Sequence, residues 1–443
     1  MIRIANAQGF WGDWLEAPVH TVDDGPIDYL TLDYLAEVTM SILQKLKQRD
    51  PGQGYARDFP PLMARLARRI KERGVRVIAN AGGVNAVGCA REVRRLAPDL
   101  KVAVVLGDDV FGRVDEFLAK GYEMRNLDTG EPLSTVRDKL LSANAYLGAF
   151  PLAEALATGA DVVITGRCAD AALVLAPMIC RFGWEPYQYD LLAAGMAAGH
   201  IIECGTQCTG GNYGGDWQRI EMANIGYPIV EAEPDGTFVV TKHPGTGGLV
   251  SSHTVKEQLV YEIGDPARYM TPDVTVDFTS LKVCDESEDR VRVTGARGAA
   301  PTEFLKLSMN WAAGWKAIGT LVYSWPDAVA KARRADEIVR ARVRALGLEF
   351  EAMYTEYFGV DACHGPAAAP CADPPEVQVR IGVRGQNKAH VERFTRELVP
   401  LVLSGPPSAT GYGEGRPVVR EIVAYWPALV PRYEIRPVVE VVE

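Results

Sequence analysis

Short apolar runs alternate with helical patterns over the first half of the chain, and this alternation restricts the fold more than any other feature of the sequence. Strands are predicted where the apolar runs lie, at residues 2–5, 75–79, 101–106 and 161–164. Helices are predicted at residues 29–48 and 61–73, because apolar residues recur there at helical spacing. Strands that alternate with helices are typical of βαβ units on a parallel sheet. We therefore expect residues 1–220 to form a layered α/β domain with a parallel sheet.

The pattern changes beyond residue 220. The strands predicted there alternate between apolar and polar residues, at residues 236–241, 273–278, 290–294, 303–308 and 319–325. A period of two is typical of a sheet with one solvated face, which favours antiparallel pairing. Further elements are predicted as a helix at 327–346, a strand at 377–383, a helix at 391–401 and a strand at 418–425. We expect residues 221–443 to form an α+β domain with a mixed or antiparallel sheet, and proline and glycine indicate a flexible connection at 363–375.

Composition and charge exclude several classes of protein. The formal net charge of -10 offers no electrostatic reason to bind nucleic acid. Apolar runs such as residues 102–106 are far shorter than the ~20 residues that cross a bilayer, so no membrane partner is expected. The polar start of the chain lacks the apolar stretch of a signal peptide, and we expect a cytoplasmic protein. The eight cysteines are scattered, so we expect free thiols.

Three glycine-rich segments follow predicted strands of the first half, at residues 4–13, 80–85 and 165–170. The carboxyl ends of parallel strands lie at one edge of a sheet, where ligands bind, so we expect these segments to converge. None of them has the spacing of a Walker loop or a G-x-G-x-x-G turn, which disfavours a kinase or an NAD dehydrogenase of ordinary type. The candidate substrate-binding residues in them are Asn6, Gln8, Gly9, Gly82, Gly83, Asn85, Gly166, Arg167 and Asp170.

Each segment has a chemical reason to contact a ligand. Gly82 and Gly83 allow backbone amides to approach an anion closely. Arg167 can grip a carboxylate or phosphate with two hydrogen bonds, and Asp170 can hold that arginine in place. The alternative is that the glycines only form tight turns and that Asp170 caps a helix.

The densest cluster of polar and glycine residues lies at 200–217, where the glycines disfavour both helix and strand. One interpretation makes Glu203 a general acid or base, Cys204 or Cys208 a nucleophile, and the glycine amides an oxyanion hole. A second makes His200, Glu203 and the cysteines metal ligands, although C-x3-C without a second pair lacks structural-zinc spacing, and no metal is expected. A third sees only buried cysteines in a turn. The candidate substrate-binding residues here are Gly210, Gly211 and Asn212.

A second polar segment spans residues 242–257 and again contains adjacent glycines, Gly247 and Gly248. Two of the six histidines of the chain lie in it, His243 and His253. Either can transfer protons near neutral pH, or can serve as a structural hydrogen-bonding residue. We carry both histidines as catalytic candidates and the two glycines as substrate-binding candidates.

Together these motifs resemble the acyclic terpene utilisation family of the AtuA type. The matching motifs are residues 6–13, 80–85, 165–170, 203–212 and 243–248. Many members carry an additional small carboxyl-terminal ferredoxin-like domain, for which this chain shows no obvious counterpart. The family's name comes from the catabolism of branched terpene acids through acyl-CoA thioesters. The resemblance therefore implies a hydration, cleavage or related step on a branched or carboxylated acyl substrate.

Such chemistry passes through an enolate-like species that needs an acid/base pair and an oxyanion hole. Glu203 with His243 or His253 would transfer protons, and Arg167 would hold any free carboxylate of the substrate. Neither Cys204 nor Cys208 is expected to be an obligatory nucleophile. The resemblance thus implies a hydratase or lyase with no cofactor beyond coenzyme A as part of the substrate.

Two other functions stay open at this point. One is a thioester hydrolase, which the same residues would serve. The other is a non-catalytic ligand-binding or scaffolding subunit that works beside another polypeptide. Such a subunit would expose an apolar surface, for example at an edge strand over residues 433–441. A homo-oligomer or a partner subunit is compatible with each of these functions.

Overall fold

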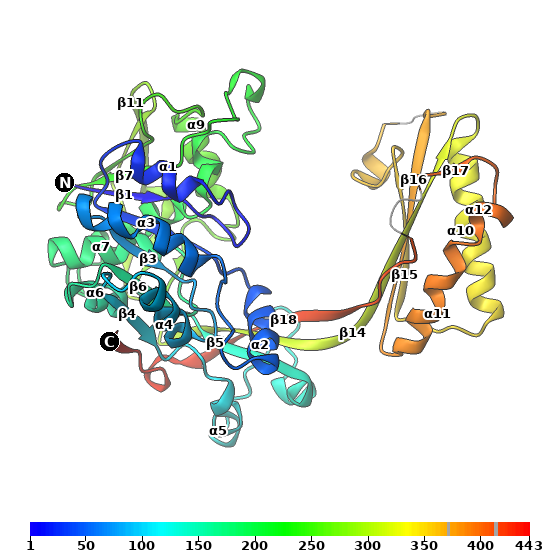
Figure 1. Ribbon diagram of the computed structural model, residues 1–443, viewed down its shortest axis with the longest axis horizontal. Coiled ribbons are helices and arrows are strands. Elements are labelled where there is room, and N and C mark those ends of the chain that lie inside the picture. The colour runs from blue at the N-terminus through cyan, green and yellow to red at the C-terminus, as the bar shows by residue number, and fades with distance from the viewer. Residues whose placement is uncertain (370–372, 412–414) are drawn as a thin grey trace. The chain divides into compact units, whose positions relative to one another are not determined.

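The computed structural model describes residues 1–369, 373–411 and 415–443, which form two compact units of a mixed α/β protein (Figure 1). Unit 1 contains Met1–Asn310 and Tyr425–Glu443, and unit 2 contains Trp311–Ala424. These units differ from the halves expected on either side of residue 220, because residues 221–310 pack within unit 1. The mixed α/β class itself is confirmed.

Unit 1 is built on a ten-stranded sheet in the order β11-β12-β8-β7-β1-β2-β3-β6-β4-β19. The strands in the middle of this sheet are β1 (Ile2–Asn6), β2 (Tyr29–Leu32), β3 (Arg76–Ala79), β6 (Val162–Thr165) and β4 (Val102–Leu106), and they run parallel to one another. The strands predicted at 2–5, 75–79, 101–106 and 161–164 are therefore confirmed. Because these strands are parallel, their carboxyl ends lie at one edge of the sheet.

Antiparallel strands flank this parallel centre. They are β7 (Ile229–Ala232), β8 (Phe238–Thr241), β12 (Arg290–Thr294), β11 (Lys282–Ser287) and β19 (Val438–Val442). A second, three-stranded sheet contains β13 (Arg297–Ala299), β10 (Thr275–Asp277) and β9 (Tyr269–Met270). Strand β5 (Leu140–Ala145) pairs with β14 (Phe304–Ser324). The edge strand expected at 433–441 is present as β19, which pairs with β4.

The prediction of a helix at 29–48 is wrong for its first residues. Tyr29–Leu32 forms β2 between β1 and β3, and the helix that follows, α2, spans only Thr39–Arg49. All four residues of β2 are buried. A parallel strand that is covered on both faces has a continuous apolar run, and periodicity cannot distinguish such a run from a helix.

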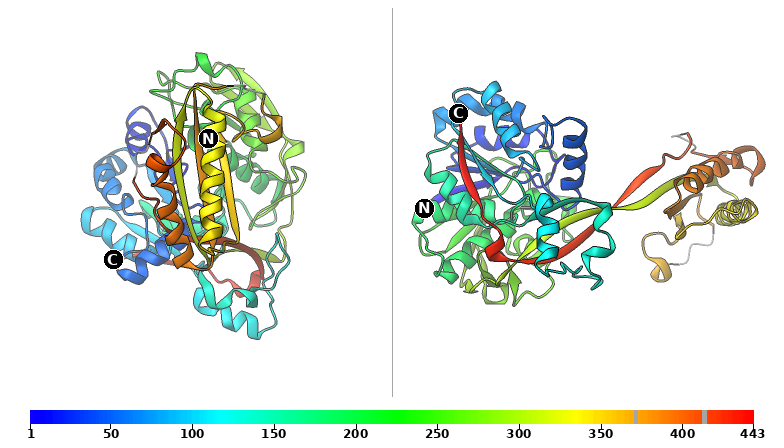
Figure 2. Two further views of the ribbon diagram at one scale, coloured as in Figure 1. Left: turned by 90° about the vertical axis from the view of Figure 1, so that its right-hand side faces the viewer. Right: turned by 90° about the horizontal axis from the view of Figure 1, so that it is seen from below.

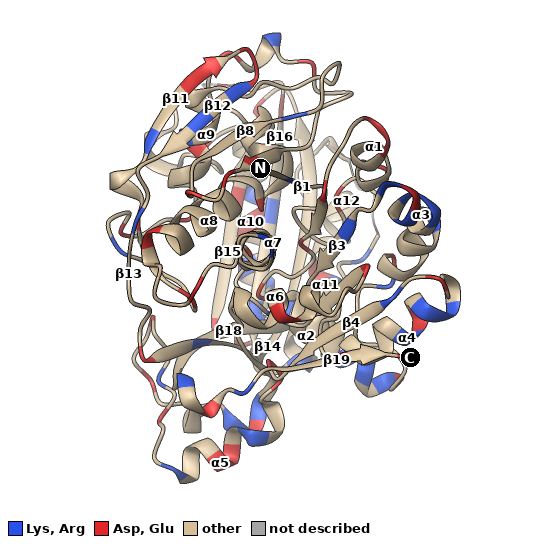
Figure 3. Ribbon diagram, turned by 90° about the vertical axis from the view of Figure 1, so that its left-hand side faces the viewer, with Lys and Arg blue, Asp and Glu red and all other residues tan. Residues whose placement is uncertain are grey.

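The other helices of unit 1 are α1 (Ala17–Asp23), α3 (Phe59–Arg73), α4 (Ala86–Leu96), α5 (Val114–Ala119), α6 (Ala149–Ala157), α7 (Ala172–Phe182), α8 (Tyr189–Ile202) and α9 (Ser252–Val260). Helix α3 confirms the helix predicted at 61–73. Its residues Leu62, Leu66 and Ile70 are buried at helical spacing, and it ends at Gly74 in the left-handed conformation. Figure 3 shows charged residues on α3 and α5, whereas the buried strand β4 carries none.

Unit 2 contains most of β14, then α10 (Ala328–Ala345), β15 (Ala352–Phe358), β16 (Glu376–Gly385), α11 (Lys388–Leu398), α12 (Leu401–Ser404) and β17 (Ala409–Thr410). The chain returns to unit 1 through β18 (Arg420–Pro431), which also pairs with β14. The sheet order is β15-β16-β14-β17, and the β-α-β-β-α-β connectivity is ferredoxin-like. The sequence did not reveal this ferredoxin-like unit, which is inserted within unit 1 between Asn310 and Tyr425.

One face of the unit 2 sheet is covered by α10 and α11 (Figure 2). Leu321, Val379 and Ile381 of the sheet pack there with Val339 of α10 and Phe394 of α11. The elements predicted at 327–346, 377–383, 391–401 and 418–425 correspond to α10, β16, α11 with α12, and β18. The strands predicted at 303–308 and 319–325 form the single strand β14.

The connection predicted at 363–375 is described only in part, since residues 370–372 lie outside the described residues. Its flexibility therefore stays a prediction. In the part of the chain that the structure describes, no helix is both long and apolar enough to cross a bilayer.

Candidate active site

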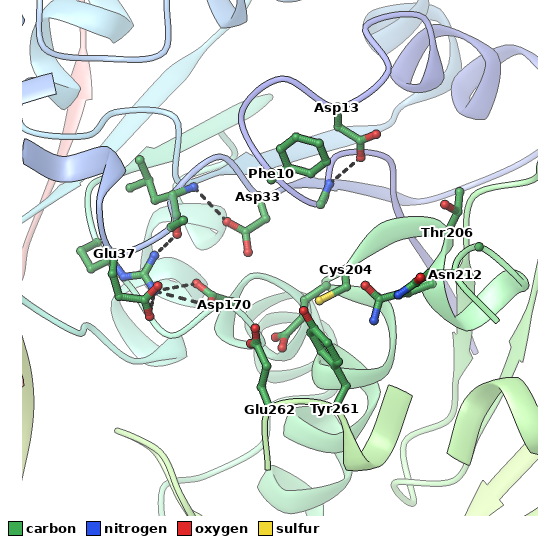
Figure 4. Close-up of a pocket in the computed structure, with 17 residues that line it drawn as sticks. Phe10, Asp13, Asp33, Glu37, Asp170, Cys204, Thr206, Asn212, Tyr261 and Glu262 are labelled. Carbon is green, nitrogen blue, oxygen red and sulfur yellow. Dashed lines mark hydrogen bonds and ion pairs between the residues drawn. The ribbon is translucent and has the colours of Figure 1, made fainter. Parts of the chain in front are cut away.

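A pocket of about 390 Å³ lies within unit 1, where the carboxyl ends of three parallel strands meet the end of α8 (Figure 4). The loops after β1, β2 and β6 supply one side of it, and the segments after α8 and α9 supply the other. The residues that line it are Gly9, Phe10, Asp13, Asp33, Leu35, Ala36, Glu37, Arg167, Asp170, Glu203, Cys204, Thr206, Gln207, Gly211, Asn212, Tyr261 and Glu262. Convergence of the strand ends places polar groups from distant parts of the sequence in one cavity.

Seven of the residues singled out from the sequence line this pocket. They are Gly9, Arg167, Asp170, Glu203, Cys204, Gly211 and Asn212. Two more support its walls from behind. The Asn6 side chain donates hydrogen bonds to the Ile202 and Glu203 carbonyls at 2.6 and 2.8 Å, and Gln8 donates to the Phe10 carbonyl at 2.6 Å.

The segment after β3 shapes the pocket without lining it. A side chain at Gly82 would place its Cβ 2.7 Å from the Thr165 carbonyl oxygen, so glycine permits close packing of two loops. Gly83 has a φ of 52°, in the left-handed region. Asn85 caps α4 by accepting a hydrogen bond from the Gly88 amide at 3.1 Å. These three residues therefore act on the fold of the loop.

Gly166 also permits close packing. The Cβ of any other residue at this position would lie 2.3 Å from the carboxylate of Asp108. That carboxylate accepts a hydrogen bond from the Arg167 amide at 2.8 Å. Asp108 is buried, and burial raises its pKa to about 7. This contact fixes the backbone from which the Arg167 side chain enters the pocket.

The proton-transfer pairs predicted from the sequence are not formed. His243 lines a different cavity, where its Nε2 lies 2.9 Å from the Thr21 carbonyl and burial lowers its pKa. His253 is exposed in the first turn of α9 and does not line the pocket. The pairing of Glu203 with either histidine is therefore corrected, because separate elements hold all three residues apart.

Glu203 pairs instead with His200, which precedes it by one helical turn. The His200 Nδ1 lies 2.9 Å from the Glu203 Oε1. The His200 ring stacks on Phe278 at 5.4 Å between centroids, and its carbonyl accepts a hydrogen bond from Gln258 at 3.1 Å. Burial by itself lowers the pKa of His200, but the Glu203 carboxylate raises it above the usual value. One oxygen of Glu203 is thus held in place, while Oε2 has no partner among the described residues.

Three of the glycine amides proposed as an oxyanion hole already have acceptors. The amide of Gly211 donates to the Thr206 carbonyl at 2.8 Å. Those of Gly247 and Gly248 donate to carbonyls of the 221–224 segment at 2.7 and 2.8 Å, respectively. Gly210, with a φ of 100°, permits the turn that brings these two loops together. The glycines build the loops, and these amides do not face an open position.

Arg167 lines the pocket, yet its guanidinium is 1% exposed and already bonded. It donates hydrogen bonds to the Leu35 carbonyl and, at 3.2 Å, to the Tyr146 hydroxyl, and it lies 3.3 Å from the Asp170 carboxylate. Its guanidinium also stacks on the Tyr146 ring at 4.4 Å. Its role as an anion anchor stays a prediction, and little of its donor capacity is free for one.

Asp33 was not identified from the sequence, although it directly follows β2. Its Oδ1 accepts hydrogen bonds from the Asn80 side chain at 2.6 Å and from the Leu35 amide at 3.2 Å. Burial raises the pKa of Asp33 to about 6, against the opposing charge of Arg167, and Glu203 contributes to the rise. Since both hydrogen bonds reach Oδ1, the proton that Asp33 holds up to about pH 6 belongs on Oδ2. The wrong helix prediction at 29–48 concealed this residue.

The cysteines near the pocket are thiols. Burial raises the pKa of Cys204 to about 12. Cys208 is fully buried and its thiol donates weakly to the Gly205 carbonyl at 3.8 Å, and burial raises its pKa as well. The described cysteines are all free, and Cys371 lies outside the described residues. Across residues 1–369, 373–411 and 415–443, no cluster of His, Cys, Asp or Glu has the arrangement of a metal site.

Comparison with known proteins identifies the family of the chain. The model of the family described as acyclic terpene utilisation family protein AtuA matches residues 2–441, nearly the full length of the chain. Searches of curated proteins and of solved structures found no match. The chain therefore belongs to the acyclic terpene utilisation family, and this membership indicates a role in acyclic terpene catabolism.

Proposed function

We propose that this protein is a catabolic enzyme that performs acid–base chemistry on a branched acyl-CoA thioester, as a hydratase or a carbon–carbon lyase. The observation that carries the proposal is a pair of carboxyl groups in one pocket with different tasks. Glu203 is oriented by His200, and Asp33 holds a proton up to about pH 6. Pairs of carboxyl groups whose surroundings separate their pKa values are typical of acid–base catalysis.

The unpaired Oε2 of Glu203 is suited to take a proton from the carbon next to the thioester carbonyl. The electron pair of that C–H bond then moves onto the carbonyl oxygen, which becomes an enolate oxygen. Asp33 donates a hydrogen bond from Oδ2 to that oxygen, as a carboxylic acid can when a buried site keeps it neutral. Water addition or loss and carbon–carbon cleavage share this intermediate, so the same two groups serve both reactions.

The charge of the pocket favours an uncharged, branched acyl group over a carboxylated one. Asp13, Glu37 and Glu262 line the pocket in addition to the groups above. Arg167 is the cation among the lining residues, and its hydrogen bonds and ion pair are already taken by the protein. A free carboxylate on the substrate would meet like charges without a strong anchor.

A cysteine-dependent thioester hydrolase is disfavoured by the same pocket. Attack on a thioester requires a thiolate, and burial raises the pKa of Cys204 to about 12. Hydrolysis would instead need a water molecule activated by Glu203.

The direct test is exchange of the proton next to the thioester carbonyl. Saturated branched acyl-CoA thioesters of increasing length are incubated with the full-length protein in D₂O, and deuterium incorporation is followed by mass spectrometry. We expect incorporation with the native protein and its loss with Glu203→Gln. Glu233→Gln, a charge-matched change on a partly exposed residue outside the pocket, serves as the control. Equal incorporation in Glu203→Gln, or none with any thioester in the native protein, would rule the proposal out.

A further inference from the structure

The face of the unit 2 sheet opposite α10 and α11 carries two cations, Lys316 and Arg384, that no acid compensates among the described residues. Residues alternate between the two faces along each strand, so Lys316, Ile318 and Thr320 of β14 lie on this open face. Lys316 and Ile318 are exposed, whereas the intervening Ala317 is buried. The open face is therefore defined by the register of the three strands and not by one loop.

Two cations stand directly opposite each other in this register. Lys316 on β14 pairs with Arg384 on β16, whose other neighbour is Ala352 on β15. Like charges at directly opposed positions of a sheet destabilise it. Four residues along β16, by contrast, Arg380 is opposite Glu356 and forms an ion pair with it at 2.5 Å. The row of Arg380 is neutralised within the sheet, whereas the row of Arg384, on the other side of the Gly382 row, is not.

A cavity of about 290 Å³ adjoins the uncompensated row. Lys316, Arg416 and Arg420 line it, together with Ile318 and Thr320 of the open face and Leu398 of α11, so the cavity extends beside β14 toward the face that α11 covers. No Asp or Glu is among the described residues that line it, and none of its three cations forms an ion pair with a described residue. A concentrated positive potential is unusual on a chain whose net charge is -10, and it favours an anionic ligand.

An exposed aromatic ring lies one row away on the same face. Tyr354 is 68% exposed and is opposite Gly382, which in turn is opposite Ile318. Because Gly382 has no side chain, the surface between Tyr354 and Ile318 is flat. A purine ring stacks well on such a platform. Neighbouring strands are about 4.8 Å apart, so Tyr354 and Lys316 lie on columns roughly 10 Å apart, a span that a nucleotide bridges.

We infer that the open face of unit 2, together with the cavity beside β14, binds the nucleotide end of a coenzyme A thioester, with its phosphates at Lys316, Arg384, Arg416 and Arg420 and its adenine against Tyr354. The choice of coenzyme A among nucleotides rests on the proposed function.

Binding is measured by calorimetry on the full-length protein with coenzyme A, 3′,5′-ADP, inorganic phosphate and a single-stranded oligonucleotide as separate ligands. We expect coenzyme A and 3′,5′-ADP to bind, and Arg416→Ala/Arg420→Ala to weaken both by about 10-fold or more, since each change removes a charge-assisted contact. Arg333→Ala/Arg396→Ala, which removes two exposed charges from α10 and α11, is the matched control and should not change the affinity. Tyr354→Ala should weaken 3′,5′-ADP more than inorganic phosphate.

Affinities that are equal in the two double variants would overturn the site. Preference for the oligonucleotide, or for inorganic phosphate over 3′,5′-ADP, would overturn the ligand class. Glu203→Gln keeps this face intact, so it should bind coenzyme A normally even if the proton-exchange test fails. Loss of coenzyme A binding in Glu203→Gln would also contradict the inference, because the nucleotide would then depend on the unit 1 pocket.

Discussion

In the pocket of unit 1 the charged groups are held by buried partners, whereas Lys316 and Arg384 on the open face of unit 2 have no ion-pair partner among the described residues. Arg167 is enclosed by Leu35, Tyr146 and Asp170, and Glu203 is held by His200. Lys316 and Arg384 face each other across two strands with no acid between them. The first arrangement orients groups for chemistry, and the second leaves charge available to a ligand.

The difference follows from where each set of residues lies in its sheet. Strand ends of a parallel sheet converge inside the fold, so polar groups there are desolvated and their pKa values shift. The open face of an antiparallel sheet stays in water, where charged side chains remain accessible and attract ligands of opposite charge over a long range. Substitutions in the pocket should therefore change stability and catalytic rate, and substitutions on the face should change affinity.

The largest effect is expected from Arg167→Met. This change leaves Asp170 facing the pocket without its ion-pair partner and should cost about 3 kcal/mol of unfolding free energy, the lower end for breaking a buried pair. Chemical denaturation measures it, with the exposed Arg181→Met as control. An unchanged free energy of unfolding, with weakened binding of acidic substrates, would make Arg167 an anion anchor instead.

Glu203→Gln should reduce turnover by about 100-fold or more, the usual cost of losing a general base, while the protein stays folded. Steady-state rates with the thioester that exchanges fastest in D₂O provide the measurement. The substitution keeps the size of the side chain, so circular dichroism should match the native protein. Turnover within a few-fold of native would assign the base to another residue.

Asp33→Asn tests the proton held in the pocket. Because burial raises the pKa of Asp33 to about 6 in the folded state, the folded protein binds this proton more tightly than the unfolded chain does. The stability that the folded protein gains by binding this proton is fully present below about pH 4 and is lost as the pH rises from about 4 to 6. Native turnover should fall above about pH 6, because the proton leaves Asp33. Asp33→Asn should remove the pH dependence of stability and that of turnover, and it should lower turnover about 10-fold. A native pH profile identical to that of the variant would contradict the role.

His200→Asn should lower turnover about 10-fold with little change in KM, as expected for a residue that orients another. The pH–rate profile distinguishes positioning from packing, because the profile should change once the imidazole that holds the Glu203 carboxylate is gone. His253→Asn, on the exposed turn of α9, is the control and should leave the profile unchanged.

Cys204→Ser should have the smallest effect, within about 3-fold on turnover, because a thiol with a pKa near 12 supplies no thiolate at neutral pH. Intact mass after incubation with the thioester measures any covalent adduct. An acyl group attached to Cys204 would assign the protein to the thioester-forming enzymes.

The periodicity of the sequence was sufficient for the parallel strands at β1, β3, β4 and β6 and for helices such as α3 and α10, since each is defined by local patterns of apolar residues. It was also sufficient to identify the glycine-rich segments that surround the pocket. It failed at β2, where burial on both faces removes the period that distinguishes strand from helix.

Pairing was decided by the tertiary structure alone. Glu203 pairs with His200 and not with His243 or His253. The end of α8 places His200 and Glu203 on one side of the helix, whereas His243 and His253 belong to other elements. Likewise, the opposition of Lys316 and Arg384 exists only once β14 and β16 are in register. The sequence by itself determines residue types and local periodicity. The pairing of charged side chains depends on burial and strand register, and these are set by the whole fold.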